Sequence, residues 1–407
     1  MKINIITVIF PLNWIKSSII NLPTNKSISY FWNFGSFLGI VLIIQIISGL
    51  LLSINFVRES LLAFDSVIIL TRDRFFGFLL RWIHLNCASL FFAVVYLHIF
   101  RGFFYMSFRL RLPWIRGTTI LLLLIGTAFL GYVLPWGQIS LWGATVITNL
   151  VSTIPFIGQL LVVWIWGGFR VNTYTLGVFY SVHFILPIII LGFVLIHIIV
   201  LHETGSSSKL ILHTNENKIK FYFSFVIKDI INLIFLLVFI IFVFFSPFKL
   251  GDPENFSYAN SLRSPLHIQP EWYFLFAYAI LRSIPNKLGG VIALVISVVL
   301  LYFFPFFSKQ KKPLIKTHGF YVWMFFFESL ILTWIGGNPV EAPYILIGQV
   351  FTFLYFLNIF ILILCFRIFK SIRFIPLRKN TYSTLRLIKL IFFLRVINNY
   401  MFVYILL

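Results

Sequence analysis

Long apolar segments separated by short polar ones run along almost the whole chain. A helix needs roughly 20 apolar residues to cross the hydrocarbon core of a bilayer. The chain contains eight apolar runs near this length, at about 32–54, 75–104, 116–135, 173–203, 223–246, 288–307, 319–337 and 346–369. This pattern predicts an all-α integral membrane protein with eight transmembrane helices.

The segment between the third and fourth runs is also apolar, but glycine and proline interrupt it. Residues 136–168 contain WGQISLWGATVITNL and then STIPFIGQLLVVWIWGG. Gly and Pro are the residues that most often break regular elements. We therefore predict short interfacial helices that lie on the membrane surface here, rather than a ninth crossing.

Composition and charge agree with a membrane protein. Hydrophobic residues make up 60% of the chain and charged residues 11%, with a mean hydropathy of +1.00, whereas soluble domains carry about 25% charged residues. Basic clusters at 101–116 and 309–316 contribute to the net charge of +21 and fall in alternate connections. Because inner loops are enriched in Lys and Arg, both termini are predicted on the inner side. A nucleic-acid-binding protein would gather its basic residues on one face, so we exclude that class.

Four histidines stand inside the apolar runs at a repeated spacing. His84 and His98 lie 14 residues apart in the second run, and His183 and His197 lie 14 residues apart in the fourth. At 3.6 residues per turn, the members of each pair share one face of their helix and are separated by ~21 Å along its axis. Since both runs cross in the same direction, the side chains form two stacked pairs, His84 with His183 and His98 with His197.

A single buried histidine is about as often a core residue, hydrogen-bonded to a neighbour, as it is a ligand. Ionisable side chains inside a membrane are costly and usually functional, and the same spacing on two parallel helices favours ligands. Zinc sites usually gather three or four protein ligands at one point, but each level here offers two imidazoles. Two axial nitrogens suit a haem, whose porphyrin supplies the other four ligands.

Glycines in the first and third runs repeat the spacing of the histidines. They form two pairs that are again 14 residues apart, Gly35 with Gly49 and Gly117 with Gly131. A missing side chain lets the helix backbone approach a flat ring, although glycine is also common where membrane helices pack closely. Arg81 and Arg101 each lie about one turn from a histidine and could pair with haem propionates. Their other possible role is to anchor the helix ends at the membrane surface.

Between about residues 30 and 350 the chain contains a series of long contiguous motifs. They are WNFGS at 32–36, GYVLPWGQISLWGATVITN at 131–149, HFILP at 183–187, LHETGS at 201–206, PEWYF at 270–274, AILRSIPNKLGGV at 279–291 and WIGGNPVEAPYILIGQ at 334–349. In these motifs the sequence resembles the cytochrome b family, the haem-carrying core subunit of the mitochondrial ubiquinol–cytochrome c reductase, or respiratory complex III. The resemblance implies that the first four transmembrane helices form a haem-binding four-helix bundle.

The resemblance also implies two haem b groups. His84 and His183 would ligate the low-potential haem near the outer surface, and His98 and His197 would ligate the high-potential haem near the matrix. The residues expected to pack against the haems or to bind their propionates are Arg81, Arg101, Gln45, Gly35, Gly49, Gly117 and Gly131.

An outer quinol-oxidising site is a further implication of the resemblance. Oxidation of a quinol releases two protons, so a carboxylate near membrane depth is a useful acceptor. Glu271 lies in an apolar stretch, with Tyr278 as a hydroxyl partner; a solvated loop carboxylate would have more polar neighbours. The residues expected around this site are Phe129, Tyr132, Gly143, Pro270, Glu271 and Tyr278.

An inner quinone-reducing site must take up protons instead. His202 follows the fourth apolar run and Asp229 opens the fifth, so both are predicted on the inner side. Judged from their positions alone, both residues would be ordinary polar groups at helix ends. With the resemblance, a His–Asp pair that holds the two quinone carbonyls is chemically sensible, assisted by Ser206, Asn33 and Ser36.

Together these features predict a subunit that oxidises ubiquinol at the outer site and passes electrons through two b haems to quinone at the inner site, which contributes to proton translocation. The predicted division is a haem-binding bundle at 1–210, a membrane domain at 211–370 and a basic, apolar extension at 371–407. The family implies a Rieske iron–sulfur subunit, a cytochrome c-type subunit, other complex III subunits and a homodimeric complex in the mitochondrial inner membrane. The competing hypotheses are a cofactor-free proton-coupled transporter, with the histidines as a relay, and a purely structural membrane subunit.

Overall fold

The computed structural model describes residues 20–207, 218–307 and 315–373. In these ranges, eight helical segments are long and apolar enough to cross a membrane. This confirms the predicted class, a multi-pass helical membrane protein. The main helices of these segments are α2 (Phe34–Ser53), α4 (Gly77–Phe104), α5 (Arg111–Val133), α8 (Thr173–Thr204), α9 (Ser224–Phe245), α11 (Lys287–Val299), α13 (Ile315–Gly336) and α14 (Tyr344–Arg373).

Two spans differ in detail from the apolar runs. The third was predicted to begin near residue 116, but α5 begins at Arg111 and includes Pro113 in its first turn. Proline is tolerated there because the first amide groups of a helix have no partner within it. The sixth span continues beyond α11 through the 3₁₀-helix η8 (Leu300–Phe303) into α12 (Phe304–Phe307).

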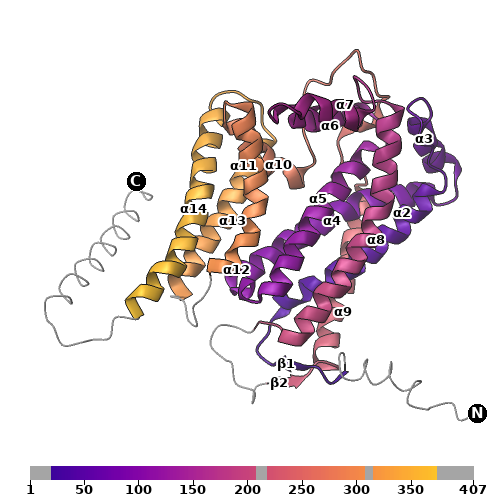
Figure 1. The fold of residues 1–407 in the computed structure, drawn as a ribbon. Coiled ribbons are helices and arrows are strands. Elements are labelled where there is room, and N and C mark those ends of the chain that lie inside the picture. The colour runs from indigo at the N-terminus through magenta and orange to yellow at the C-terminus, as the bar shows by residue number, and fades with distance from the viewer. Residues whose placement is uncertain (1–19, 208–217, 308–314, 374–407) are drawn as a thin grey trace, which may run out of the picture.

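Short helices lie outside the spans. The predicted interfacial segment forms α6 (Gln138–Thr148) and α7 (Gly158–Trp166), which lie across one end of the long helices (Figure 1). Two further short helices were read from the sequence only as connections, α3 (Ala63–Asp73) and α10 (Leu275–Ser283). At the opposite end, the strands β1 (Pro23–Asn25) and β2 (Lys218–Lys220) pair antiparallel. The two ends of the molecule are named below the α6–α7 end and the β1–β2 end.

Helices α2, α4, α5 and α8 form the first bundle. Helix α2 packs against α4, and α5 packs against α8. Figure 1 shows that α4 and α8 both run from the α6–α7 end toward the β1–β2 end, while α2 and α5 run the other way. The His-bearing helices are therefore parallel, as the loop charges predicted.

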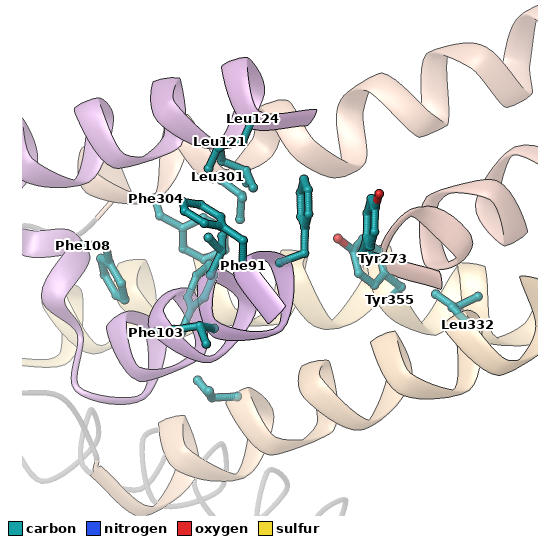
Figure 2. Close-up of a cluster of buried hydrophobic side chains, with 14 of the residues drawn as sticks. Phe91, Phe103, Phe108, Leu121, Leu124, Tyr273, Leu301, Phe304, Leu332 and Tyr355 are labelled. Carbon is teal, nitrogen blue, oxygen red and sulfur yellow. The ribbon is translucent and has the colours of Figure 1, made fainter. Parts of the chain in front are cut away.

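Helices α10, α11, α13 and α14 form a second group beside the first bundle (Figure 1). A buried hydrophobic cluster joins the two groups (Figure 2). Its labelled members come from α4, the short connection between α4 and α5, α5 and the later helices: Phe91, Phe103, Phe108, Leu121, Leu124, Tyr273, Leu301, Phe304, Leu332 and Tyr355. The ring of Tyr273 stacks on that of Phe92 in α4, which holds residues 270–273, named below the PEWY segment, against this helix. Of the predicted C-terminal extension, residues 371–373 end α14 and the remainder lies outside the described residues.

Candidate functional site

The first histidine pair meets in a cavity at the α6–α7 end of the first bundle. His84 of α4 and His183 of α8 have ring centroids 6.4 Å apart, with their planes at 89°. Both rings line a mainly apolar cavity of about 280 Å³. The predicted partners Gln45, Gly49, Arg81 and Gly131 line the same cavity.

Hydrogen bonds fix the protonation of these two imidazoles. His183 Nδ1 lies 2.8 Å from the carbonyl oxygen of Thr127, which can only accept, so this nitrogen carries the proton. His84 Nδ1 lies 2.9 Å from Ser48 Oγ, and that hydroxyl already donates to the carbonyl of Ile44. Both rings therefore donate through Nδ1 and keep a free lone pair on Nε2, which is the arrangement of a metal-ligating histidine.

The second pair, His98 and His197, lies on the same two helices toward the β1–β2 end. His98 Nδ1 lies 3.2 Å from Arg101 Nη2. His197 Nδ1 is buried; it lies toward the carbonyl of Pro113 without a well-formed hydrogen bond. Arginine has no acceptor atom, so His98 Nδ1 accepts here. For His98 to bind a metal through Nε2 with Nδ1 protonated, Arg101 must turn away to another partner.

The four glycines predicted from their spacing face the four histidines. A Cβ built on Gly49 would lie 3.0 Å from Cε1 of His84, and one on Gly131 would collide with the ring of His183. At the other level, a Cβ built on Gly35 would lie 3.6 Å from Cε1 of His98, and one on Gly117 would lie 3.4 Å from Cε1 of His197. Any larger residue would occupy the space beside the imidazoles, so the glycines keep both levels open.

These observations fit two haem groups. Each level offers two imidazoles from facing helices, and each imidazole is flanked by a glycine backbone. Gln45 Oε1 is buried in the first cavity and finds no hydrogen-bond donor among the described residues. Arg81 lines that cavity, with its guanidinium 4.8 Å from the ring centroid of Phe256. Within the described ranges, no cluster of three or more His, Cys, Asp or Glu forms an ordinary metal site.

A second, smaller cavity of about 40 Å³ lies beside the first, between α5, α6 and the PEWY segment. All six residues expected around the outer site line it: Phe129, Tyr132, Gly143, Pro270, Glu271 and Tyr278. A Cβ built on Gly143 would meet no atom of the described residues within 4 Å, so the face of α6 is open at this point. The Tyr278 hydroxyl donates to the carbonyl of Ile268 at 3.2 Å. Tyr132 and Glu271 also line the first cavity and thus separate the two.

Glu271 is the chemically distinctive residue between the two cavities. Its side chain is 9% exposed, and its Oε1 is buried without a hydrogen-bond donor among the described residues. The Tyr132 hydroxyl lies near the carboxylate and favours its charged form. Burial raises the pKa of Glu271 to about 7, and the nearby charge of Asp252 contributes in the same direction. A carboxyl with this pKa can both accept and release a proton near neutral pH.

At the β1–β2 end, three of the five residues expected around the inner site meet where α2 and α9 begin. Ser36 Oγ donates to Asp229 Oδ1 at 2.7 Å. Asn33 Nδ2 donates to the carbonyl of Lys228 at 2.6 Å. His202 and Ser206 lie at the end of α8 and just after it, and among the described residues no hydrogen bond joins either of them to Asp229. The predicted His–Asp pair is thus not joined by a direct hydrogen bond.

Three partners of these sites were not identified from the sequence. Buried Asn232 donates to the Asn33 carbonyl at 3.3 Å and lies 3.0 Å from Ser36 Oγ. It stands one helical turn after Asp229, so helical spacing could have revealed it. Ser48 and the Thr127 carbonyl orient the first imidazole pair, but nothing in their sequence positions marks them for this role.

Comparisons with known proteins agree with this geometry. The profile of the family described as Cytochrome b/b6/petB matches residues 19–205, and that of Cytochrome b(C-terminal)/b6/petD matches residues 258–356. A solved structure described as a hyperthermophilic respiratory Complex III matches with a TM-score of 0.82 and 30% identity. The match covers 90% of this chain and 97% of the other. With both family profiles matched and the fold shared over nearly its whole length, the chain belongs to the cytochrome b family.

Proposed function

We propose that this chain is the two-haem cytochrome b of a ubiquinol–cytochrome c reductase. Ubiquinol would be oxidised at the α6–α7 end, and quinone would be reduced at the β1–β2 end. The main support for this proposal is the pairing of four histidines on parallel helices, each beside a glycine of a facing helix. His84 with His183, and His98 with His197, would hold the haems, which when bound accept and pass on single electrons.

At the α6–α7 end, the chain's own residues supply the proton chemistry. A quinol in the smaller cavity would lie against Glu271, whose unpaired Oε1 can accept a hydroxyl proton. The Tyr132 hydroxyl lies near the same carboxylate, and the Tyr278 hydroxyl lies at the same cavity. Because Glu271 also borders the larger cavity, a proton accepted on one side can leave on the other.

At the β1–β2 end, Asp229 and Ser36 would hold and protonate a quinone oxygen. Ser36 is linked to Asp229 and Asn232, so that its hydroxyl is held in place. His202 is half-buried at the end of the neighbouring helix α8. It would reach the second oxygen through the bound quinone rather than by contacting Asp229.

The partners and location belong to the same proposal. They are a Rieske iron–sulfur subunit, a cytochrome c-type subunit, further complex III subunits and a second copy of the complex in a mitochondrial inner membrane, with both termini on the matrix side. The similarity over 97% of a chain from a respiratory Complex III supports membership of such an assembly. The eight apolar helices support a multi-pass placement in the bilayer.

A proton relay through the histidines is the competing function. A relay needs each imidazole to pass protons from one side to the other. The Nδ1 proton of His183 is directed at the Thr127 carbonyl, which cannot carry it further. The facing glycines have no role in a relay, so the geometry favours haem ligation.

Removal of one ligand should halve the haem content. We expect His183→Ala in the assembled complex to lose the haem at the α6–α7 end, because His84 alone cannot supply both axial nitrogens. Extraction of haem with alkaline pyridine and measurement of its absorbance, per mole of chain, gives the content directly. The exposed His267 provides the control, His267→Ala, which should keep the full content. Equal content in both variants would refute haem ligation by His183.

The inner site should depend on its carboxylate. We expect Asp229→Asn to slow quinone reduction by about 10²-fold, the usual effect of losing a group that transfers protons. The measurement is the initial rate of ubiquinone reduction by the chemically reduced complex. Exposed Glu203 lies at the same end, and Glu203→Gln should leave the rate unchanged. A similar rate in Asp229→Asn and wild type would remove Asp229 from the site.

A further inference from the structure

The two histidine levels differ in the charges around them. The cavity of His84 and His183 is lined by one guanidinium, that of Arg81, together with the carboxyl groups of Asp252 and Glu271. At the level of His98 and His197 the strongest neighbouring charges are cationic: Arg101 acts on both rings, and Arg116 also acts on His197. The β1–β2 level is therefore the more electropositive.

Arg116 occupies a place that no assigned function explains. It precedes Gly117 in the first turns of α5, and Gly117 is the glycine that faces His197. Its Nη1 atom is buried and has no hydrogen-bond partner in the described part of the chain. Arg101 is in the same condition, since its Nε is buried and unpaired there.

Unpaired buried N–H groups of a guanidinium are costly, because the lost water contacts are not replaced. Two of them at one level indicate an anionic partner that binds both arginines. Arg111 of the same helix shows the ordinary alternative for a basic residue at a helix end. Its guanidinium stacks on Phe306, 4.3 Å from the ring centroid, and the residue is exposed to solvent.

We propose that Arg116 is a further propionate-binding residue for the haem held by His98 and His197, beside Arg101, which the family resemblance already implies for this role, and that the charge of Arg116 raises the midpoint potential of this haem. The inference rests on the proposed function. Guanidinium groups match carboxylates with paired, charge-assisted hydrogen bonds. Reduction adds one negative charge to the haem, and a fixed positive charge nearby favours that step. Pairing with a propionate would also draw Arg101 away from His98 Nδ1 and restore its proton.

The test is a redox titration of the b-type absorbance in the assembled complex, with haem content measured in parallel. We expect Arg116→Gln to lower the midpoint potential of the higher-potential component and to leave the lower one in place. Arg116→Lys, which keeps the charge, should recover most of the shift. Arg111→Gln is the matched control, because it removes a cation from the same helix away from the histidines.

Loss of the higher-potential component in Arg116→Gln, with its return in Arg116→Lys, also supports the proposal. It would mean that the haem is retained only when a positive charge at position 116 binds its propionates. Unchanged midpoints in Arg116→Gln would overturn it, as would an equal shift in Arg111→Gln or a loss that lysine does not restore. These outcomes leave the proposed function standing. Absence of both b-type components from the wild-type complex would instead refute the proposed function, and this inference with it.

Discussion

Gly131→Leu should remove one of the two b-type components. A side chain at this position collides with the ring of His183 even before a haem is considered. Leucine would displace that imidazole and fill the space beside it, so we expect the haem content of the assembled complex to fall by half. The optical spectrum of the reduced complex and the extracted haem both report this loss.

Gly126 supplies the matched control on the same helix. A Cβ at Gly126 would meet no atom of the described residues within 4 Å, so Gly126→Leu should keep both components. The smaller change Gly131→Ala tests the same contact if the leucine variant does not assemble. Retention of both components in Gly131→Leu and Gly131→Ala would show that the glycine does not border a haem.

Glu271→Gln should slow quinol oxidation by roughly 10²-fold or more, the range typical for loss of a positioned proton acceptor. The amide keeps the shape of the side chain, but it cannot take a proton from the quinol. The measurement is the initial rate of ubiquinol-dependent cytochrome c reduction by the complex. Glu254→Gln is the control, because the exposed Glu254 lies at the same end of the molecule.

The pH profile identifies Glu271 more specifically than the rate alone. Since burial raises its pKa to about 7, the carboxylate is lost by protonation as the pH falls through that value. The wild-type rate should therefore decline on the acid side of pH 7, and the residual rate of Glu271→Gln should show no such decline. If the rate of the variant declined in the same way below pH 7, the titrating group would be a residue other than Glu271.

The spans and the histidine pairs could be predicted from sequence because each follows from a single periodicity. Roughly 20 consecutive apolar residues specify a crossing, and a spacing of 14 specifies a shared helix face. Helix α3 was not predicted, because its 11 residues are too few to cross a membrane and include the charged Asp65, Arg72 and Asp73. The extra turn at the start of α5 was not predicted, because Arg111 is polar and a proline such as Pro113 usually signals the end of a helix.

The contacts between distant segments could not be read from the chain. The Ser48 hydroxyl and the Thr127 carbonyl reach the histidines only through the rotation and packing of α2 and α5, which no local pattern specifies. The resemblance supplied the residues of the outer cavity, whereas the structure shows that Tyr132 and Glu271 form its wall toward the histidines. His202 and Asp229 are near the same end, yet only the structure reveals that no hydrogen bond joins them directly.

The central claim is that the four histidines hold two haems in different surroundings. An anaerobic redox titration of the purified complex, followed by its b-type absorbance, tests this claim most directly. We predict two components of equal amplitude with separate midpoint potentials, and two haems per chain on extraction. A single component, or a complex without b-type absorbance, would contradict the account.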